Sequence, residues 1–203
     1  MAVWFTSDWH LQHNKLGVEI RGYESVEQHD EAVIATVNQY VRPDDILWCL
    51  GDISLGKLDS GLALLSRVNA RMELIYGNHD KGSPIHRDAW KIQKKYLEVF
   101  ESVQAYAKLK ISGVTNSVLL SHYPWNGDGE GGRDLEERYS QFRLNRDPEV
   151  PRILIHGHTH STLRVDGPDS IHVGWDAWHR PVHLDEVREL AVSLEEQWST
   201  TSR

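Results

Sequence analysis

Five short polar segments of the sequence carry the residue types that bind metal ions in proteins. Each follows a stretch of apolar residues. They read Asp8-Trp-His10, Gly51-Asp52, Gly77-Asn-His-Asp80, Ser121-His122 and Gly157-His-Thr-His160. Imidazole and carboxylate together suit manganese, iron, zinc, cobalt or nickel better than calcium or magnesium, which prefer oxygen ligands alone. The residue types therefore indicate a transition-metal site.

The spacing within two of these segments favours convergence on one point. In extended backbone, residues i and i+2 point to the same side, so Asp8 with His10, and His158 with His160, would each aim two ligands together. Gly157 would let the backbone approach closely. Taken alone, each segment has an ordinary reading as a turn or a capping pair. Five in order, each behind an apolar run, indicate a site.

The elements that must position these segments alternate along the first half of the chain. The expected strands are 3–6, 46–50 and 72–76. The expected helices run from a capping box at Ser25 to Pro43, through 58–68, and from Asp88 to about Phe100. This repeat of strand, polar tip and helix is typical of α/β units with a largely parallel sheet. Functional groups of such sheets gather outside the carboxyl ends of the strands, so the tips would be neighbours in space.

Strands dominate the second half of the chain. Further strands are expected at 103–111, 117–121, 152–155, 162–165 and 170–173, and a last strand and a terminal helix within 181–198. We expect two packed sheets flanked by helices, forming a single domain over residues 1–203. The glycine-rich stretch 126–134 predicts a mobile loop, either a solvated connection or a lid beside the site.

The composition limits the classes of function. At 39% hydrophobic and 26% charged residues, the chain of 203 residues is typical of a soluble globular protein. No apolar run approaches the ~20 residues that span a bilayer, and the single cysteine, Cys49, fits a reducing compartment. We expect no secretory signal and a cytoplasmic protein. The net charge of −8 argues against an extended nucleic-acid surface, and we expect no membrane partner. A small phosphoester or nucleotide remains compatible, because bound metals would reverse the charge locally.

The five segments resemble, in order, the motifs of the calcineurin-like metallophosphoesterase superfamily. Those motifs are Asp-x-His, Gly-Asp, Gly-Asn-His-Asp/Glu, a lone His, and Gly-His-x-His, and the matches span residues 8 to 160. The short chain, with Val173-Gly-Trp-Asp176 close to a final Pro-Val, is similar to small stand-alone bacterial and phage members. The resemblance implies an α/β fold, a four-layer α-β-β-α sandwich in which two mixed β-sheets are flanked by helices.

The resemblance also implies two divalent transition-metal ions, manganese first, with zinc, iron, nickel or cobalt as alternatives. The implied ligands are Asp8, His10 and His160 for one ion, Asn78, His122 and His158 for the other, and Asp52 as the bridge. Two ions about 3.5–4 Å apart clamp the attacking and leaving oxygens of an in-line displacement. Since Asp8 and Asp52 are the only anions of this set, the loaded site would be electropositive despite the acidic chain.

The same resemblance assigns catalysis to His79 and Asp80. A water that bridges two cations loses most of its proton affinity, so a metal-bridging hydroxide would attack phosphorus. His79 would protonate or stabilise the leaving alkoxide, and Asp80 would orient the His79 ring.

Other polar and aromatic residues near the segments have open roles. His13 and Asn14 would contact the substrate or cap a short helix. His156 is expected to point away from the metals, as a core residue or a group behind the ligands. The tryptophans beside the tips would pack in the core or offer one ring to a base: Trp9, Trp125, Trp175 and Trp178.

The second motif bears on the substrate. Protein Ser/Thr phosphatases of the superfamily extend it to Gly-Asp-x-x-Asp-Arg-Gly, whereas this chain reads Gly51-Asp52-Ile-Ser-Leu-Gly56 and lacks that Asp and Arg. A monoester carries about two charges and gains most from an arginine, and a diester carries one. We therefore predict a binuclear metal-dependent phosphodiesterase for small phosphodiesters, cyclic nucleotides among them.

Three alternatives to this prediction stay open. A phosphomonoesterase would draw a cation from Arg133, Arg143 or Arg146, near the glycine-rich stretch. A nuclease is disfavoured by the acidic charge. A non-catalytic scaffold is disfavoured because all seven implied ligands and His79 are present.

Overall fold

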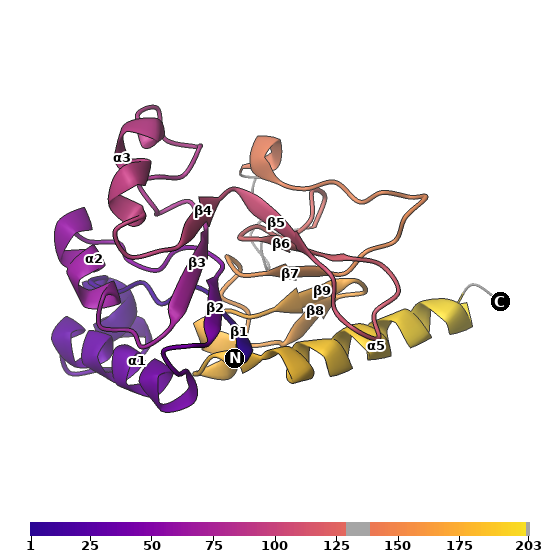
Figure 1. Ribbon diagram of the computed structural model, residues 1–203, viewed down its shortest axis with the longest axis horizontal. Coiled ribbons are helices and arrows are strands. Elements are labelled where there is room, and N and C mark those ends of the chain that lie inside the picture. The colour runs from indigo at the N-terminus through magenta and orange to yellow at the C-terminus, as the bar shows by residue number, and fades with distance from the viewer. Residues whose placement is uncertain (129–138, 202–203) are drawn as a thin grey trace.

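Two five-stranded β-sheets form the centre of the protein (Figure 1). The computed structural model describes residues 1–128 and 139–201. The first sheet has the strand order β10-β1-β2-β3-β4, with β1 (Val3–Thr6), β2 (Ile46–Cys49), β3 (Arg71–Ile75), β4 (Ser102–Gln104) and β10 (Val182–His183). The second has the order β5-β6-β7-β9-β8, with β5 (Tyr106–Leu109), β6 (Val118–Ser121), β7 (Leu154–His156), β8 (Val165–Gly167) and β9 (Ser170–His172).

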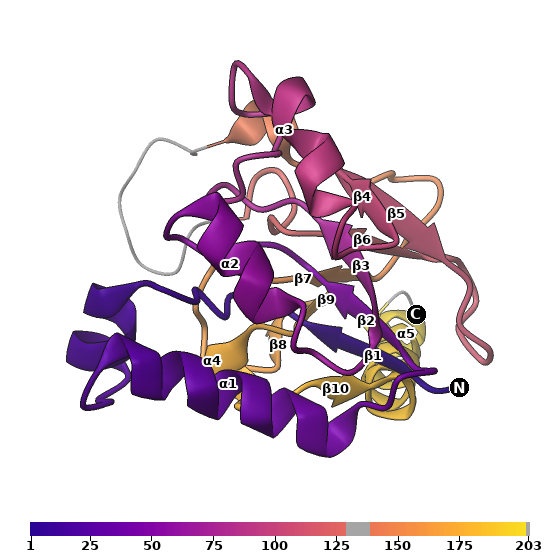
Figure 2. The ribbon, with the colours of Figure 1, turned by 60° about the vertical axis from the view of Figure 1, so that its left-hand side comes forward.

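The helices flank the sheets unevenly. The α-helices are α1 (Val26–Tyr40), α2 (Leu58–Leu65), α3 (Ala89–Tyr96), α4 (Trp175–Trp178) and α5 (Leu184–Thr201), with a π-helix η1 (Lys15–Ile20) and a 3-10 turn η2 (Ser140–Phe142). Figures 1 and 2 show α1, α2 and α3 together on the outer side of the first sheet. The long helix α5 contacts β10 and β1 of the first sheet and β9 of the second. No helix in the described ranges is long and apolar enough to cross a membrane.

The strands of the first sheet pack apolar side chains on both faces. Leu47 and Leu74 belong to the core beneath α1, α2 and α3, whereas Phe5 and Ile75 belong to the core between the two sheets. Successive residues of a strand point to opposite faces, so a sheet buried on both sides needs continuous apolar runs. This explains why 3–6 and 46–50 are almost continuously apolar, and why 72–76 is apolar except for Glu73.

The predicted fold class is confirmed: two mixed β-sheets are flanked by helices. The strands β1, β2, β3 and β4 are parallel and β10 is antiparallel to β1; in the second sheet β6, β7 and β9 are parallel, with β5 and β8 antiparallel at the edges. The loops after the parallel strands β1, β2, β3, β6 and β7 carry the five polar segments.

Two strand predictions were wrong in detail. The run 103–111 is not one strand, because β4 joins the first sheet and β5 joins the second. Apolar residues continue to alternate along the sequence across the break, with Val103 packed against one core and Ala107 in the other, so the pattern gives no sign of the change. The strand expected at 162–165 begins only at Val165.

The glycine-rich loop prediction falls mostly outside the described residues. Asn126 to Asp128 form a turn in which the Asp128 amide donates to the Trp125 carbonyl at 3.1 Å. Residues 129–134, including Arg133, lie outside the described ranges.

Candidate metal centre

Five of the seven proposed ligands have a left-handed backbone. Their φ angles are 59° at Asp8, 52° at His10, 53° at Asp52, 70° at His158 and 52° at His160. Only three other non-glycine residues of the described ranges have positive φ. This conformation is unfavourable by on the order of 1 kcal/mol for an L-residue, although Asp and His tolerate it better than most. The expected extended backbone at these ligands was therefore wrong. Through left-handed turns, Asp8 and His10 reach one group of candidate ligands, whereas His158 and His160 reach different groups.

Hydrogen bonds between neighbouring loops hold these turns. The Asp8 amide donates to the Gly51 carbonyl and the His10 amide to the Asp52 carbonyl, both at 3.0 Å. The His158 amide donates to Asp8 Oδ2 at 3.0 Å and so joins the loops of the two sheets. These bonds satisfy backbone groups that leave their strands and would otherwise be buried without a partner.

Two glycines allow the loops to approach this closely. A Cβ atom on Gly157 would overlap the Ser7 hydroxyl and the Asp8 carboxylate. A Cβ atom on Gly77 would overlap the carboxylate and amide of Asp52. The expectation that Gly157 permits a close backbone approach is confirmed.

The first group of candidate ligands joins Asp8, His10 and His160, whose ligand atoms lie within 4.8 Å of one another. His10 Nε2 and His160 Nε2 are 3.1 Å apart. Asp8 Oδ1 lies 3.7 Å from the first and 3.9 Å from the second, and it is buried without a hydrogen-bond partner. Ligands about 2.0–2.2 Å from one ion lie roughly 3–3.5 Å apart. An unpaired carboxylate oxygen between two imidazole nitrogens fits a cation.

The second group joins Asp52, His122 and His158, again with ligand atoms within 4.8 Å. His122 Nδ1 donates to the Leu50 carbonyl at 2.8 Å, so the Nε2 atom faces the group and would be the ligand atom once deprotonated. That Nε2 atom is 3.1 Å from His158 Nδ1, 3.1 Å from Asn78 Oδ1 and 3.4 Å from Asp52 Oδ2.

Asp52 lies between the two groups. Its Oδ2 atom is 3.4 Å from His122 Nε2 in the second group and 3.8 Å from His10 Nε2 in the first. Its Oδ1 atom accepts the His79 amide at 2.8 Å. One carboxylate oxygen that faces both groups has the placement that a bridging ligand needs.

The buried charges are arranged to keep both carboxylates ionised. Burial alone would raise the pKa of Asp52, but the charge and hydrogen bond of His122 hold it below its ordinary value. Burial likewise opposes ionisation of Asp8, yet the nearby His10, 3.7 Å away, and the charges of His122 and His160 lower the pKa of Asp8 well below 3.8. Against its own burial, the charge of Asp52 raises the pKa of His122 to about 9. Metal uptake would therefore release a proton from His122.

His79 lines the pocket, whereas Asp80 is buried beneath it. The His79 side chain is 43% exposed, and its Nε2 atom is 3.9 Å from Asp52 Oδ2. Burial lowers the pKa of His79 below its ordinary value. Among the described residues no hydrogen bond joins the Asp80 carboxylate to the His79 ring, and the orienting role of Asp80 stays a prediction. Asp80 Oδ2 instead accepts the amides of Asp52 at 2.9 Å and Gly77 at 2.8 Å, because the buried carboxylate closes the gap between the loops after β2 and β3.

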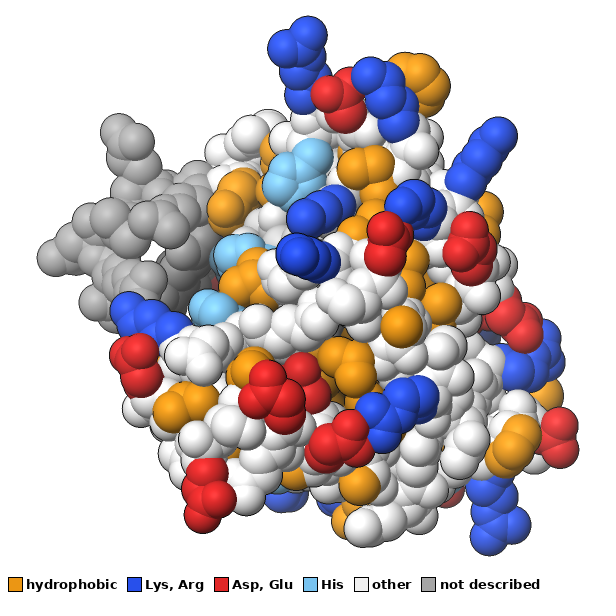
Figure 3. Space-filling model, turned by 90° about the vertical axis from the view of Figure 1, so that its left-hand side faces the viewer, with side chains coloured by type: hydrophobic (Ala, Val, Ile, Leu, Met, Phe, Trp, Pro, Cys, Tyr) orange, Lys and Arg blue, Asp and Glu red, His pale blue; other side chains and the backbone are white. Residues whose placement is uncertain are grey.

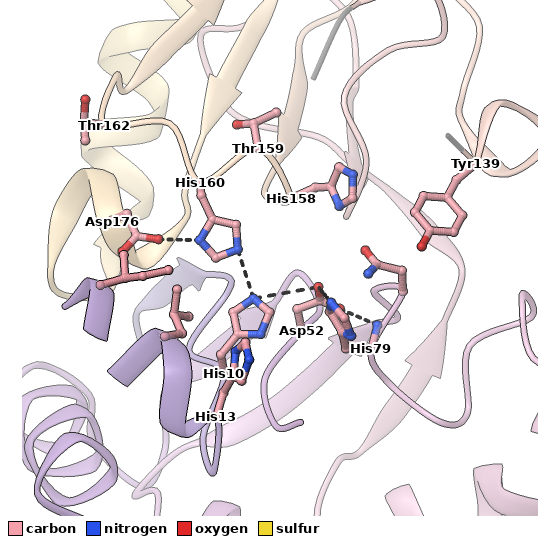
Figure 4. Close-up of a pocket in the computed structure, with 13 residues that line it drawn as sticks. His10, His13, Asp52, His79, Tyr139, His158, Thr159, His160, Thr162 and Asp176 are labelled. Carbon is pink, nitrogen blue, oxygen red and sulfur yellow. Dashed lines mark hydrogen bonds and ion pairs between the residues drawn. The ribbon is translucent and has the colours of Figure 1, made fainter. Parts of the chain in front are cut away.

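A pocket of about 600 Å³ opens over both groups (Figure 4). Its lining comprises His10, His13, Leu16, Ile20, Asp52, Asn78, His79, Tyr139, His158, Thr159, His160, Thr162 and Asp176. In Figure 4, the rings of His10, His79, His158 and His160 point toward a common space above Asp52. Figure 3 shows histidine side chains reaching the surface near one another on the face that carries α2 and α3.

Of the other polar and aromatic residues near the motifs, His13 lines the pocket and most of the rest are buried in the core. His13 lines the pocket, whereas Asn14 precedes η1 without a side-chain cap hydrogen bond. His156 is fully buried and pairs with Asp166 at 2.9 Å, outside both ligand groups. The four tryptophans are all buried and none lines the pocket: Trp9, Trp125, Trp175 and Trp178.

Two residues of the site were missed in the sequence. Asp176 accepts a hydrogen bond from His160 Nδ1 at 2.6 Å, and Arg21 pairs with Asp176 at 2.8 Å. Asp176 follows β9 by four positions, so it lies beyond the carboxyl end of a sixth strand, as the five motifs lie beyond theirs. This position after a strand is the feature of the sequence from which Asp176 could have been predicted. Arg21 had none.

Comparison with known proteins agrees with this geometry. The sequence matches the calcineurin-like phosphoesterase superfamily domain over residues 1–173. Gene 66 protein of Mycobacterium phage D29 is 41% identical over 204 residues, which covers 96% of this chain and 98% of that protein. Gene 66 protein of Mycobacterium phage L5 is 40% identical over 206 residues, 96% of each.

A solved structure of similar fold is available for comparison. The protein of unknown function AQ665 from Aquifex aeolicus has a TM-score of 0.64 at 21% identity and covers 93% of this chain and 98% of its own. The match to the superfamily model and the two groups of His and Asp side chains lead to one conclusion. The chain belongs to the metal-dependent calcineurin-like phosphoesterase superfamily.

Proposed function

We propose that the protein is a binuclear metal-dependent phosphodiesterase that hydrolyses small phosphodiesters, cyclic nucleotides among them. Asp8, His10 and His160 would hold one ion. Asn78, His122 and His158 would hold the other, and Asp52 would bridge the two. When bound, two divalent transition-metal ions, manganese first, would activate water and offset the charge of the phosphate.

The observation that carries the diester preference is the lining of the pocket. Among the described residues that line it there is no lysine or arginine. A monoester dianion is bound best by charge-assisted hydrogen bonds, most often from arginine. A diester carries one negative charge and needs fewer cations. A pocket whose described walls offer imidazoles, an amide and hydroxyls suits the diester better.

The arginines considered for monoester binding are engaged elsewhere or undescribed. Arg146 makes ion pairs with Asp128 at 2.7 Å and with Asp169 at 2.6 Å and does not line the pocket. Arg143 is buried and donates to the Asp128 carbonyl at 2.8 Å. Arg133 lies outside the described residues. The positions of the described arginines therefore also favour a diester over a monoester substrate.

The remaining walls suit an organic group attached to the phosphate. Leu16 and Ile20 from η1 add apolar surface to one side, and Ile20 is 66% exposed. A volume of about 600 Å³ is within the usual range for small-molecule sites, roughly 300–1,000 Å³. His79 at the rim would assist the leaving group. Because its pKa is lowered, the ring would be mostly neutral near pH 7 and would donate an N–H hydrogen bond to the departing oxygen.

The test is a comparison of rates on matched substrates. Protein stripped of metal by chelation is reloaded with manganese, nickel or zinc. It is then assayed on bis-nitrophenyl phosphate, nitrophenyl phosphate, and 2′,3′- and 3′,5′-cyclic nucleotides. We expect turnover that requires metal and is faster on the diesters. Monoester turnover well above diester turnover would contradict the preference, and no turnover with any metal would favour a scaffold.

A further inference from the structure

We propose that Asp176 and Arg21 are positioning residues that fix the His160 ring for the first metal ion and hold it against the loop that carries Asp8. The proposal rests on the metal centre of the proposed function. It adds two residues that lie outside the five motifs and whose expected effect is on metal affinity.

Asp176 sets the orientation and tautomer of the His160 ring. Its Oδ2 atom is 2.6 Å from His160 Nδ1. Because a carboxylate accepts hydrogen bonds, Nδ1 carries the proton and the Nε2 lone pair is left free. That Nε2 atom faces His10 Nε2 at 3.1 Å, in the first ligand group. A carboxylate behind a ligating imidazole restrains the ring and raises its basicity.

Arg21 holds Asp176 in place with two parallel hydrogen bonds. Arg21 Nε donates to Asp176 Oδ1 at 2.8 Å, and Nη2 donates to Asp176 Oδ2 at 3.0 Å. The two residues are 155 positions apart, and the Arg21 side chain is only 7% exposed. A paired, buried guanidinium in this fork geometry has little freedom to move.

The same guanidinium supports the strained turn at the first motif. Nη2 donates to the Asp8 carbonyl and Nη1 to the Trp9 carbonyl, both at 2.8 Å. Nη1 also donates to His29 Nε2 at 3.0 Å, which anchors Arg21 to α1. One side chain therefore ties together the left-handed Asp8, the Asp176 carboxylate and, through Asp176, the His160 ligand.

A second His–Asp pair supplies a matched control. His156 Nε2 is 2.9 Å from Asp166 Oδ1, and His156 is four residues before His160 in the same segment. His156 belongs to neither ligand group and its Nδ1 donates to the Gly157 carbonyl at 2.9 Å. Loss of Asp166 should disturb the local packing as loss of Asp176 does, without touching a ligand.

The experiment measures Mn²⁺ binding by calorimetry on chelator-stripped Asp176→Asn, Arg21→Lys and Asp166→Asn proteins. Asparagine keeps the size of aspartate, and lysine keeps the charge of Arg21 but loses the fork. For Asp176→Asn and Arg21→Lys we expect one of two binding events to weaken about 10- to 100-fold while the other is unchanged. Asp166→Asn should bind both ions as the wild type does. Circular dichroism in chelator checks that each variant is folded.

Turnover against Mn²⁺ concentration gives an independent readout. In Asp176→Asn the metal concentration for half-maximal activity should rise by the same factor, and saturating Mn²⁺ should restore most of kcat. Wild-type Mn²⁺ affinity in a folded Asp176→Asn, or an equal loss in Asp166→Asn, would overturn the proposal. A wild-type protein that binds two ions yet hydrolyses no diester would refute the proposed function and leave the affinity result standing.

Discussion

The strands of the first sheet and the loops at their carboxyl ends differ in backbone, burial and charge. Phe5 in β1 and Leu47 in β2 are fully buried, and their strands lie in regular parallel register. A few residues later, Asp8 and Asp52 are also buried, but as charged groups in left-handed conformation. Asp8 Oδ1 even lacks a hydrogen-bond partner.

This difference indicates that the strands contribute to the free energy of unfolding and that the ligand-bearing loops reduce it. Apolar strands gain stability through burial, at about 25 cal/mol for each Å² of surface. Left-handed turns and unpaired buried polar atoms each oppose folding by on the order of 1–3 kcal/mol. Their concentration around one pocket is what a bound cation would explain. Substitutions in the two regions should therefore separate activity from stability.

The largest effect is expected for Asp52→Asn. Asparagine keeps an oxygen to accept the His79 amide but removes the bridging charge, so turnover of bis-nitrophenyl phosphate should fall about 1,000-fold or more. The far-UV circular dichroism spectrum should be unchanged. A loss of less than tenfold would show that Asp52 does not bridge.

Leu74→Ala should give the opposite pattern. Leu74 is fully buried in β3, and a Leu→Ala change in such a core reduces the free energy of unfolding by about 2–5 kcal/mol. Urea unfolding measures this loss. Turnover per folded molecule should stay within about twofold, because no pocket residue is changed. A large fall in kcat would show that packing within the strand also controls the geometry of the metal site.

His79→Ala should distinguish substrates by their leaving group. An alkoxide needs a proton or a hydrogen bond to depart, whereas nitrophenolate leaves readily. We expect cleavage of an alkyl ester to fall about 100-fold more than cleavage of bis-nitrophenyl phosphate. Initial rates on the two substrates check this. Equal losses would remove the leaving-group role of His79.

The smallest effect concerns His172, which is buried just behind the metal centre with both ring nitrogens unpaired. Burial, with the neighbouring His156, lowers the pKa of His172 from 6.5 to about 4. As pH falls, the unfolded chain binds the proton first, so this contribution to stability is complete above about pH 6.5 and lost toward pH 4.

Between pH 7 and pH 5 the loss should be about 2 kcal/mol. His172→Leu should remove that part of the pH dependence, as chemical unfolding at several pH values would reveal. An unchanged slope in the variant would assign the acid sensitivity to other groups.

Many of the strands and helices could be predicted because they depend on residues that are close together in the sequence. The strand at 3–6 has the predicted bounds, and the Ser25 hydroxyl accepts the Gln28 amide at 3.2 Å, as a capping box requires. The motif residues were found because ligand types recur directly after apolar runs.

The remainder of the site depends on contacts between distant segments. The left-handed turn at Asp8 is held by the Gly51 carbonyl and by Arg21, and no local pattern encodes either bond. The pairing of Arg21 with Asp176 crosses 155 positions. The π-helix at 15–20 brings Leu16 and Ile20 to the pocket, although the sequence there offers no strong signal.

The most direct test is anomalous scattering from crystals of the protein loaded with Mn²⁺. Two peaks about 3.5–4 Å apart are predicted. One should lie among Asp8, His10 and His160 and the other beside His122 and His158, with Asp52 between them. A single peak, or manganese bound elsewhere, would contradict a binuclear centre at these residues.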